Sequence, residues 1–343
     1  MQEKKAGMLG KQSFRPDRPV YIRDSGCVVG SKEGQGPLGD LFDMVSQDDK
    51  FGCDSWEEAE STLQKEAITL ALGKAGMKAQ EIRYLFAGDL LGQCMASSFG
   101  VSSFQIPLFG VNGACSTRGE TLSQGTLAVS AGIAQNVVCV TSSHFASAEK
   151  EFRYPLAYGN QRPPCSNWTV TGSGAFVLSS QAGQRNRAEI TGITTGKIVD
   201  LGMKDSMNMG ACMAPAACEL IATHFSDFGR TQEDYDKIIT GDLGYVGQTA
   251  LIDLLQTKGI DIAGKHMDCG IEIYDRNSQS TQSGGSGCGG SAVTLSAYIL
   301  RMLERKEWKR VLFVPTGALL SQTSFHEGMT IPGIAHGVVL DSA

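Results

Sequence analysis

Apolar and polar positions along the chain follow two different periods, which predicts a mixed α/β protein. From Ser55 to Gly76, apolar residues recur every three to four positions, as in a helix with one buried face. Ser55 is a typical helix N-cap, with Glu58 three residues later. Short apolar runs predict strands, at 20–22, 84–87, 137–140, 172–179 and 237–240. The run at 137–140 is apolar on both faces, which is typical of a central parallel strand.

The predicted elements occur twice in the same order. A helix, a linker and a strand lead to Gly88-Asp89-Leu90 in the first half of the chain, and the same series leads to Gly241-Asp242-Leu243 in the second. A glycine-rich turn, a helix and an apolar strand follow each time, with Cys115 at the first turn and Cys288 at the second. We interpret this recurrence as an internal duplication of one β-α-β unit.

The duplication predicts how the chain is divided. We expect an N-terminal half over residues 1–185, which includes a polar insertion at 149–168, and a C-terminal half over 186–343. A length of 343 residues is enough for two sizeable cores. The two halves would form one molecule about a pseudo-twofold axis, with both cysteine turns near the centre. The stretch 331–340 is predicted to be the last strand of the second half.

The stretch from Gly110 to His144 is predicted to be a tight glycine turn, a helix and a buried strand, with Cys115 at the start of the helix. The helix would run through Leu122 and Val129 as far as Ile133. Unpaired backbone N–H groups and the positive end of the helix dipole would lower the pKa of a thiol at this point and favour a bound anion. The alternative interpretation is a buried structural cysteine.

Composition excludes several classes of protein. The formal net charge is −6, and the Lys and Arg residues are scattered, which does not favour nucleic-acid binding. No apolar run approaches the roughly 18 residues of a membrane span, and the first residues lack the apolar stretch of a signal peptide. The 10 cysteines include no CxxC pair and no zinc-ligand spacing, which indicates reduced cytosolic thiols and no metal site.

Particular motifs resemble those of a known family. A duplicated α/β chain with a cysteine turn in its first half and a glycine-rich turn at the matching point of its second half is similar to the thiolase and ketoacyl-synthase superfamily. Within it, the chain resembles the stage V sporulation protein AD (SpoVAD) family through FGVNGACST, TSSHF, TVTGSGAFVLS, TGDLG, GGSGCGGSA and TIPGIAHGVVL. The resemblance implies a thiolase-like fold, two duplicated βαβαβ-type halves in a layered α-β-α-β-α arrangement, and a homodimer.

The resemblance also implies a function. Members of this family are expected to bind dipicolinic acid or its calcium chelate. With the other SpoVA proteins they would move this acid into the developing spore and release it at germination. The expected location is peripheral, on the cytoplasmic side of the forespore and spore inner membrane. No cofactor and no nucleic-acid partner are implied.

The superfamily's catalytic groups are only partly present. Its condensing enzymes use a nucleophilic cysteine with His and Asn, or with two His, and Cys115 matches the nucleophile. Asp242 and Cys288 stand at the two positions where those partners are expected. We therefore predict a non-catalytic binding protein. Two other functions stay open. One is an active acyltransferase or condensing enzyme that pairs Cys115 with His336. The other is a scaffold that docks membrane SpoVA subunits through residues of the insertion, namely Arg153, Tyr154, Tyr158 and Trp168.

Candidate ligand-binding residues lie on both halves. The start of the first helix would offer backbone donors and the Ser116 hydroxyl, and Lys197 would supply a cation. Asp89 and Asp242 would cap loops or meet the calcium of a chelated ligand. His144 and His336 would line the cavity. The full set is Cys115, Ser116, Lys197, His336, Asp89, Asp242, Cys288 and His144.

Overall fold

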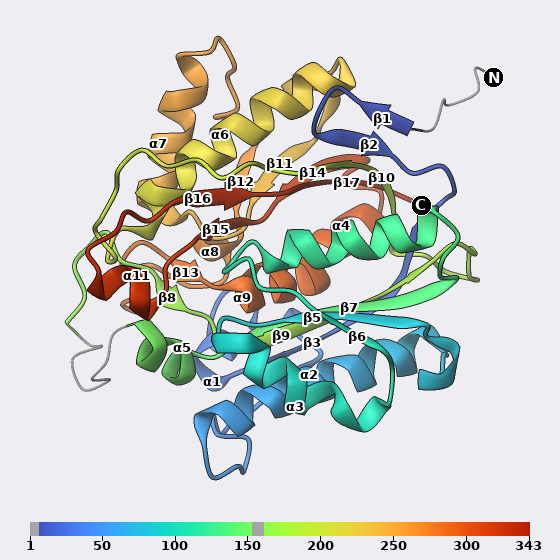
Figure 1. Ribbon diagram of the computed structural model, residues 1–343. Coiled ribbons are helices and arrows are strands. Elements are labelled where there is room, and N and C mark those ends of the chain that lie inside the picture. The colour runs from blue at the N-terminus through green and yellow to red at the C-terminus, as the bar shows by residue number, and fades with distance from the viewer. Residues whose placement is uncertain (1–6, 153–160) are drawn as a thin grey trace.

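A computed structural model describes residues 7–152 and 161–343 of the chain. Helices and sheet strands alternate in layers, with helices on both outer faces and between the two groups of strands (Figure 1). This is the predicted α-β-α-β-α arrangement of a thiolase-like fold. The predicted surface residues Arg153, Tyr154 and Tyr158 lie outside the described residues, while Trp168 belongs to β8 and stacks on Phe145 at 3.9 Å.

The strand order shows the duplication directly. The main sheet runs β12-β11-β14-β17-β10-β3-β9-β7-β5-β6, so that five strands of the second half continue into five strands of the first in mirrored order. The first set contains β3 (Tyr21–Val29), β9 (Gly172–Ser179), β7 (Asn136–Ser143), β5 (Tyr84–Gly88) and β6 (Leu108–Gly110). The second contains β10 (Ala188–Thr194), β17 (Gly337–Asp341), β14 (Arg310–Val314), β11 (Lys237–Thr240) and β12 (His266–Asp268).

Strand directions agree between the two sets. In the first, β5 is parallel to β6 and β7, and β9 is antiparallel to both β7 and β3. In the second, β11 is parallel to β12 and β14, and β17 is antiparallel to both β14 and β10. The sets meet where β10 pairs with β3 through Ala188 and Ile22. The division of the chain into two domains at residue 185 stays a prediction.

In the described part of the chain, six helices make up most of the helical layers. α2 (Trp56–Ala75) and α3 (Met95–Val101) lie on one outer face, and α6 (Met209–Phe228) and α7 (Gly244–Gln256) lie on the other (Figure 1). α4 (Thr117–Ser130) and α9 (Cys288–Thr294) lie between the two sets of strands. The central core therefore combines both halves, because Leu122 of α4, Phe176 of β9 and Phe313 of β14 belong to one buried cluster.

Helix α2 forms where its sequence pattern predicts. Ser55 Oγ accepts a hydrogen bond from the Glu58 backbone N–H at 3.1 Å, and Gly76 ends the helix with a φ of 65°. Leu63, Ala67, Ile68, Ala71 and Leu72 are buried in one cluster with residues of the sheet. The capping residues at the two ends and the stripe of apolar residues therefore indicate the same boundaries for helix α2.

Shorter elements complete the chain. The strands are β1 (Gly7–Leu9), β2 (Ser13–Arg15), β4 (Met44–Val45), β8 (Trp168–Thr169), β13 (Gly285–Ser286), β15 (Thr316–Ala318) and β16 (Gly333–Ala335). The helices are α1 (Ser31–Gly34), α5 (Phe145–Phe152), α8 (Cys269–Glu272), α10 (Leu300–Glu304) and α11 (Gln322–His326). Over the described ranges, no helix combines the length and the apolar character needed to cross a membrane.

Two predicted elements differ from the structure. The helix expected to run through Ile133 ends at Ser130, because Gly132 adopts a φ of 72°, and the Ile133 side chain is 58% exposed. The single strand expected over 331–340 is two strands, β16 and β17, which separate at His336. β16 pairs with β15, whereas β17 joins the main sheet, so the chain must change partners between them.

Candidate functional site

The two cysteine turns lie next to each other at the centre of the molecule. The first turn contains Ala114, whose φ of 53° is rare for a residue with a side chain, and it places Cys115 just before α4. The second turn contains Gly287, with a φ of 102°, directly before Cys288. The Cys115 Sγ lies 3.8 Å from the Ser286 Oγ of the second turn. Each half of the duplicated fold therefore contributes to one site.

Asp242 joins the two turns. It follows β11, and its carboxylate accepts hydrogen bonds from Ser286 Oγ at 3.2 Å, from the Gly287 N–H at 3.0 Å and from Thr316 Oγ1 at 2.8 Å. The Cys115 thiol is a further hydrogen-bond partner of this carboxylate. Asp242 is 1% exposed. A buried carboxylate with this many donors is a rigid acceptor, which holds the second turn against the first.

The electrostatics of Cys115 are the reverse of the sequence prediction. Burial raises the pKa of the Cys115 thiol well above its ordinary value, and the neighbouring Asp242 carboxylate raises it further. The N–H groups of Ser116 and Thr117, expected to face the thiol, instead donate to Gly113 and Ala114 within the turn. The prediction of a lowered pKa was therefore wrong, because burial and an adjacent carboxylate outweigh the helix dipole.

Two histidines that were predicted to line the cavity have other partners. His336 Nε2 lies 3.2 Å from Glu120 Oε1, and His336 Nδ1 accepts from the Gly196 N–H at 3.3 Å. His144 Nε2 lies 2.8 Å from the Asp49 carbonyl oxygen, and its Nδ1 accepts from the Ala146 N–H at 3.1 Å. Neither ring lines the cavity at Cys115.

The other three histidines are also engaged away from the thiol. His224 is hydrogen-bonded to Thr194 and Tyr235, and His266 to Thr240 and Gln248. His326 lies on α11. In the part of the chain that the structure describes, no imidazole lines the cavity around Cys115. Among the described residues, the thiol therefore has no imidazole beside it of the kind that activates a nucleophilic cysteine.

The cavity at Cys115 is small. Its volume is about 20 Å³, which is room for roughly one water molecule. Residues from both halves line it, namely Leu90, Ala114, Cys115, Glu149, Phe152, Asn167, Thr169, Met209, Ser286, Ala318 and Leu320. Glu149 forms a buried ion pair with Arg162 beside the cavity. The lining thus combines apolar side chains with polar ones, and the buried Arg162 cation contacts it through Glu149.

Four other predicted site residues have internal partners. Ser116 Oγ lies 2.7 Å from the Gly113 carbonyl oxygen, and Cys288 Sγ donates to the Ser142 carbonyl oxygen at 3.0 Å. Lys197 is 63% exposed and pairs with Glu219 at 2.6 Å. Asp89 accepts from the Leu91 N–H, the Ser97 N–H and the Ser97 hydroxyl. The structure brings together Cys115, Asp242 and Cys288, since Cys288 shares a buried cluster with Cys115. It directs the other predicted side chains elsewhere.

Several side chains at the site were missed by the sequence analysis. Ser286 and Thr316 donate to Asp242, yet they lie in short glycine-rich segments that carry no chemical motif. Glu149 begins the predicted insertion and Arg162 lies 13 residues further along it, and only the fold brings them together. Among residues 7–152 and 161–343, no group of three or more His, Cys, Asp or Glu side chains is arranged to hold a metal ion.

Solved structures with the same architecture include a thiolase and a 3-oxoacyl-[acyl-carrier-protein] synthase. Human mitochondrial 3-ketoacyl-CoA thiolase in complex with CoA superposes with a TM-score of 0.57 at 12% identity, over 96% of this chain and 99% of that one. 3-Oxoacyl-[acyl-carrier-protein] synthase III from Aquifex aeolicus superposes with a TM-score of 0.54 at 13% identity, over 94% and 99% of the chains. Identities this low establish the thiolase-like fold alone.

Sequence comparison is more specific than the fold. The family model described as "Stage V sporulation protein AD (SpoVAD)" matches residues 10–341. Stage V sporulation protein AD of Bacillus subtilis (strain 168) is 43% identical over 336 residues, which cover 98% of each chain. The matched region contains both cysteine turns and the Asp242 network. The chain belongs to the stage V sporulation protein AD family.

Proposed function

We propose that this chain is a non-catalytic member of the thiolase-like fold that binds dipicolinic acid, alone or as its calcium chelate, in the cleft at Cys115. One observation carries the proposal. The Cys115 thiol is buried against the Asp242 carboxylate, and no imidazole of the described chain lines its cavity. A thiol with a raised pKa forms little thiolate at neutral pH, so it is a poor nucleophile. In this proposal, the cleft at Cys115 holds a ligand and does not catalyse acyl transfer.

The lining suits an aromatic dicarboxylate. Phe152, Met209 and Leu320 offer apolar contact to a ring. Beside them, the Arg162 guanidinium already holds one carboxylate, that of Glu149, and guanidinium is the side chain that best matches carboxylate oxygens. Because the cavity holds only about 20 Å³, ligand entry requires side chains at its rim to move.

Calorimetry with dipicolinate, with and without calcium, tests the proposal. We expect the unmodified protein to bind, and we expect Met209→Trp to weaken binding at least tenfold because the larger ring fills the cavity that Met209 lines. Met329→Trp is the matched control, since Met329 is 60% exposed and does not line the cavity. The absence of binding by the unmodified protein, or equal binding by the two variants, would contradict the proposal.

An acyl-transfer function makes the opposite prediction. It requires turnover of acyl thioesters that Cys115→Ala abolishes. The binding function predicts no turnover by the unmodified protein, and dipicolinate binding by Cys115→Ala that stays within a few-fold of the original. Measuring both quantities on the same two proteins separates the two functions.

The proposal extends to the cellular setting. The protein would act with the other SpoVA proteins, peripherally on the cytoplasmic side of the spore inner membrane, to move dipicolinic acid into the developing spore and out at germination. A strain with Met209→Trp should then form spores that contain less dipicolinate than spores with Met329→Trp. Equal dipicolinate contents, with both variants present at normal levels, would show that the cleft at Cys115 is not needed to move dipicolinic acid into the spore.

A further inference from the structure

A second and larger cavity lies at the opposite ends of the sheet strands from Cys115. Its volume is about 250 Å³, compared with about 20 Å³ at Cys115. Arg310 begins β14 and lines this cavity, whereas Thr316, beyond the other end of β14, donates to Asp242. The two cavities are therefore separate sites, with strands of the main sheet between them.

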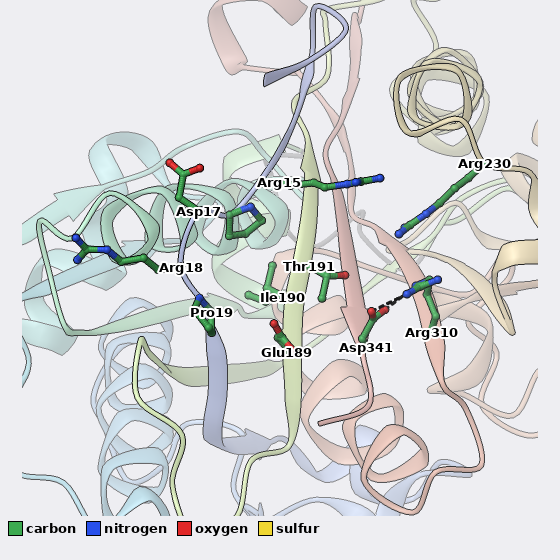
Figure 2. Close-up of a pocket in the computed structure, with 11 residues that line it drawn as sticks. Arg15, Asp17, Arg18, Pro19, Glu189, Ile190, Thr191, Arg230, Arg310 and Asp341 are labelled. Atoms are coloured by element: carbon green, nitrogen blue, oxygen red, sulfur yellow. Dashed lines mark hydrogen bonds and ion pairs between the residues drawn. The ribbon is translucent and has the colours of Figure 1, made fainter. Parts of the chain in front are cut away.

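Arginine side chains dominate one side of this cavity (Figure 2). Arg15 of β2 and Arg230, which follows α6, point toward each other, above the ion pair of Arg310 and Asp341. Both guanidinium groups lie over the ring of Phe228, at 5.4 Å for Arg15 and 5.1 Å for Arg230. One aromatic ring thus contacts both positive charges, and an anion bound between the two guanidinium groups would be stabilised by each of them.

The charges of these two arginines are not neutralised within the described part of the chain. Arg310 forms a bidentate pair with Asp341, at 2.7 and 2.8 Å, and Arg187 pairs with Asp24. Over residues 7–152 and 161–343, no carboxylate forms an ion pair with Arg15 or Arg230. Arg15 therefore retains its donors for a ligand, and Arg230 retains those that its hydrogen bond to Tyr235 does not use.

Arg230 is held in place by a buried hydrogen-bond chain. It donates to the Tyr235 hydroxyl at 3.1 Å, which lies 2.6 Å from His224 Nε2, and His224 Nδ1 lies 2.6 Å from Thr194 Oγ1. Because a guanidinium only donates, the Tyr235 proton is directed to His224, whose own proton is then on Nδ1. This direction of the hydrogen bonds is consistent with a neutral His224. The hydrogen bond to Tyr235 also fixes the Arg230 side chain, so its remaining N–H donors are oriented before a ligand binds.

We infer that this cavity binds a small organic anion, whose carboxylate or phosphate oxygens are held between Arg15 and Arg230. Thr191 also lines the cavity, and its buried hydroxyl has no hydrogen-bond partner among the described residues. Guanidinium pairs are the usual partners of planar carboxylates and of phosphates in proteins. This site does not depend on the dipicolinate cleft proposed at Cys115.

Two probes distinguish the kinds of anion. Calorimetry at low salt with inorganic phosphate and with benzene-1,3-dicarboxylate should show one site per chain for at least one of them, weakened by added salt. A response to phosphate alone would identify a phosphate ligand, and a response to the dicarboxylate alone would identify a carboxylate ligand. No binding of either probe would overturn the inference.

Variants locate the binding. Arg15→Gln and Arg230→Gln should each weaken binding by about tenfold or more. Arg185→Gln is the matched control, since Arg185 is an exposed arginine that pairs with Glu304 outside this cavity. Arg15→Gln removes no side-chain hydrogen bond to any other described residue, so it stays informative if Arg230→Gln unfolds. Unchanged binding by Arg15→Gln, or loss of all binding through Met209→Trp in the Cys115 cavity, would overturn the inference.

Discussion

At the scale of single residues, the neighbours of Cys115 decide what its thiol can do. A cysteine at the start of a helix is activated when an imidazole or another cation lies beside it. Here the neighbour is the Asp242 carboxylate, which Ser286, Gly287 and Thr316 hold in position. Burial raises the pKa of the Cys115 thiol, and the Asp242 carboxylate at the end of β11 raises it further, so the site favours the protonated thiol.

The reactivity of Cys115 tests this interpretation. We expect iodoacetamide to modify Cys115 more slowly than the half-buried Cys53, as followed by mass spectrometry at pH 7.5 to 9. Asp242→Asn should accelerate Cys115 modification, by roughly tenfold for each unit by which the thiol pKa falls. Asp89→Asn changes the aspartate at the equivalent point of the first half and should leave the rate unchanged. A rate that is the same in all three proteins would show that burial alone controls the thiol.

Glu60 provides a second test at this scale. Burial raises the pKa of its carboxyl to about 8 from an ordinary value of 4.5, and the Asp89 carboxylate contributes in the same direction. The folded protein keeps this proton where the unfolded chain has released it, so its free energy of unfolding should fall as pH rises from about 4.5 to about 8. The slope for one such group is at most about 1.4 kcal/mol per pH unit.

Glu60→Gln should remove this contribution. As pH rises through this range, the free energy of unfolding of the original protein should fall relative to that of Glu60→Gln. Above about pH 8, the difference between the two proteins should stay constant. Chemical denaturation at a series of pH values measures it. Glu66→Gln, in the same helix, is the control and should parallel the original protein. A Glu60→Gln curve parallel to that of the original protein would contradict the raised pKa.

At the scale of elements, caps and partners decide where each helix and strand ends. Helix α2 begins at its Ser55 cap and ends at Gly76, because both ends satisfy backbone groups locally. The segment 331–340 has no such local signal. It divides into β16 and β17 because β15 pairs with one part while β14 and β10 pair with the other.

The contribution of the Ser55 cap of α2 to the free energy of unfolding can be measured. Ser55→Ala leaves the Glu58 N–H without its side-chain acceptor, and we expect the free energy of unfolding to fall by about 1 kcal/mol. Ser55→Asp keeps an acceptor at the cap and adds a negative charge near the positive end of the helix, so it should restore most of the loss. Urea denaturation measures both. Equal destabilisation by the two substitutions would contradict a capping role.

At the scale of the whole molecule, the duplication produces a site that neither half contains. The first half supplies Cys115, and the second supplies Asp242, Ser286 and Thr316. The molecule also has an open sheet edge at β6, whose Leu108 and Phe109 are 40% and 50% exposed. Exposed apolar edge strands are templates for pairing with another chain, so we propose β6 as the contact surface of the expected homodimer.

The oligomeric state tests this surface. Light scattering after size-exclusion chromatography should show a dimer for the original protein and a shift toward monomer for Phe109→Lys, because a charge at the edge strand opposes pairing. Met329→Lys places the same charge on an exposed methionine far from β6 in the sequence and should stay dimeric. A monomeric original protein, or a dimeric Phe109→Lys, would exclude this interface.

The sequence by itself determined the features that depend on nearby residues. The period of the apolar positions predicted α2 and most strands of the main sheet, and the recurrence of Gly-Asp-Leu and of the cysteine turn predicted the duplication. Particular motifs identified the family. Such features can be read from sequence because caps, turns and apolar faces involve residues only a few positions apart.

Only the tertiary structure decided the chemistry of the site. The helix start at Cys115 suggested a lowered thiol pKa, yet burial and Asp242, which is distant in the sequence, raise it. The positions of His144, His336 and Lys197 were likewise decided by partners on other elements. The reason is physical. The pKa and direction of a buried side chain depend on which distant charges and donors the fold places around it, and no local pattern specifies them.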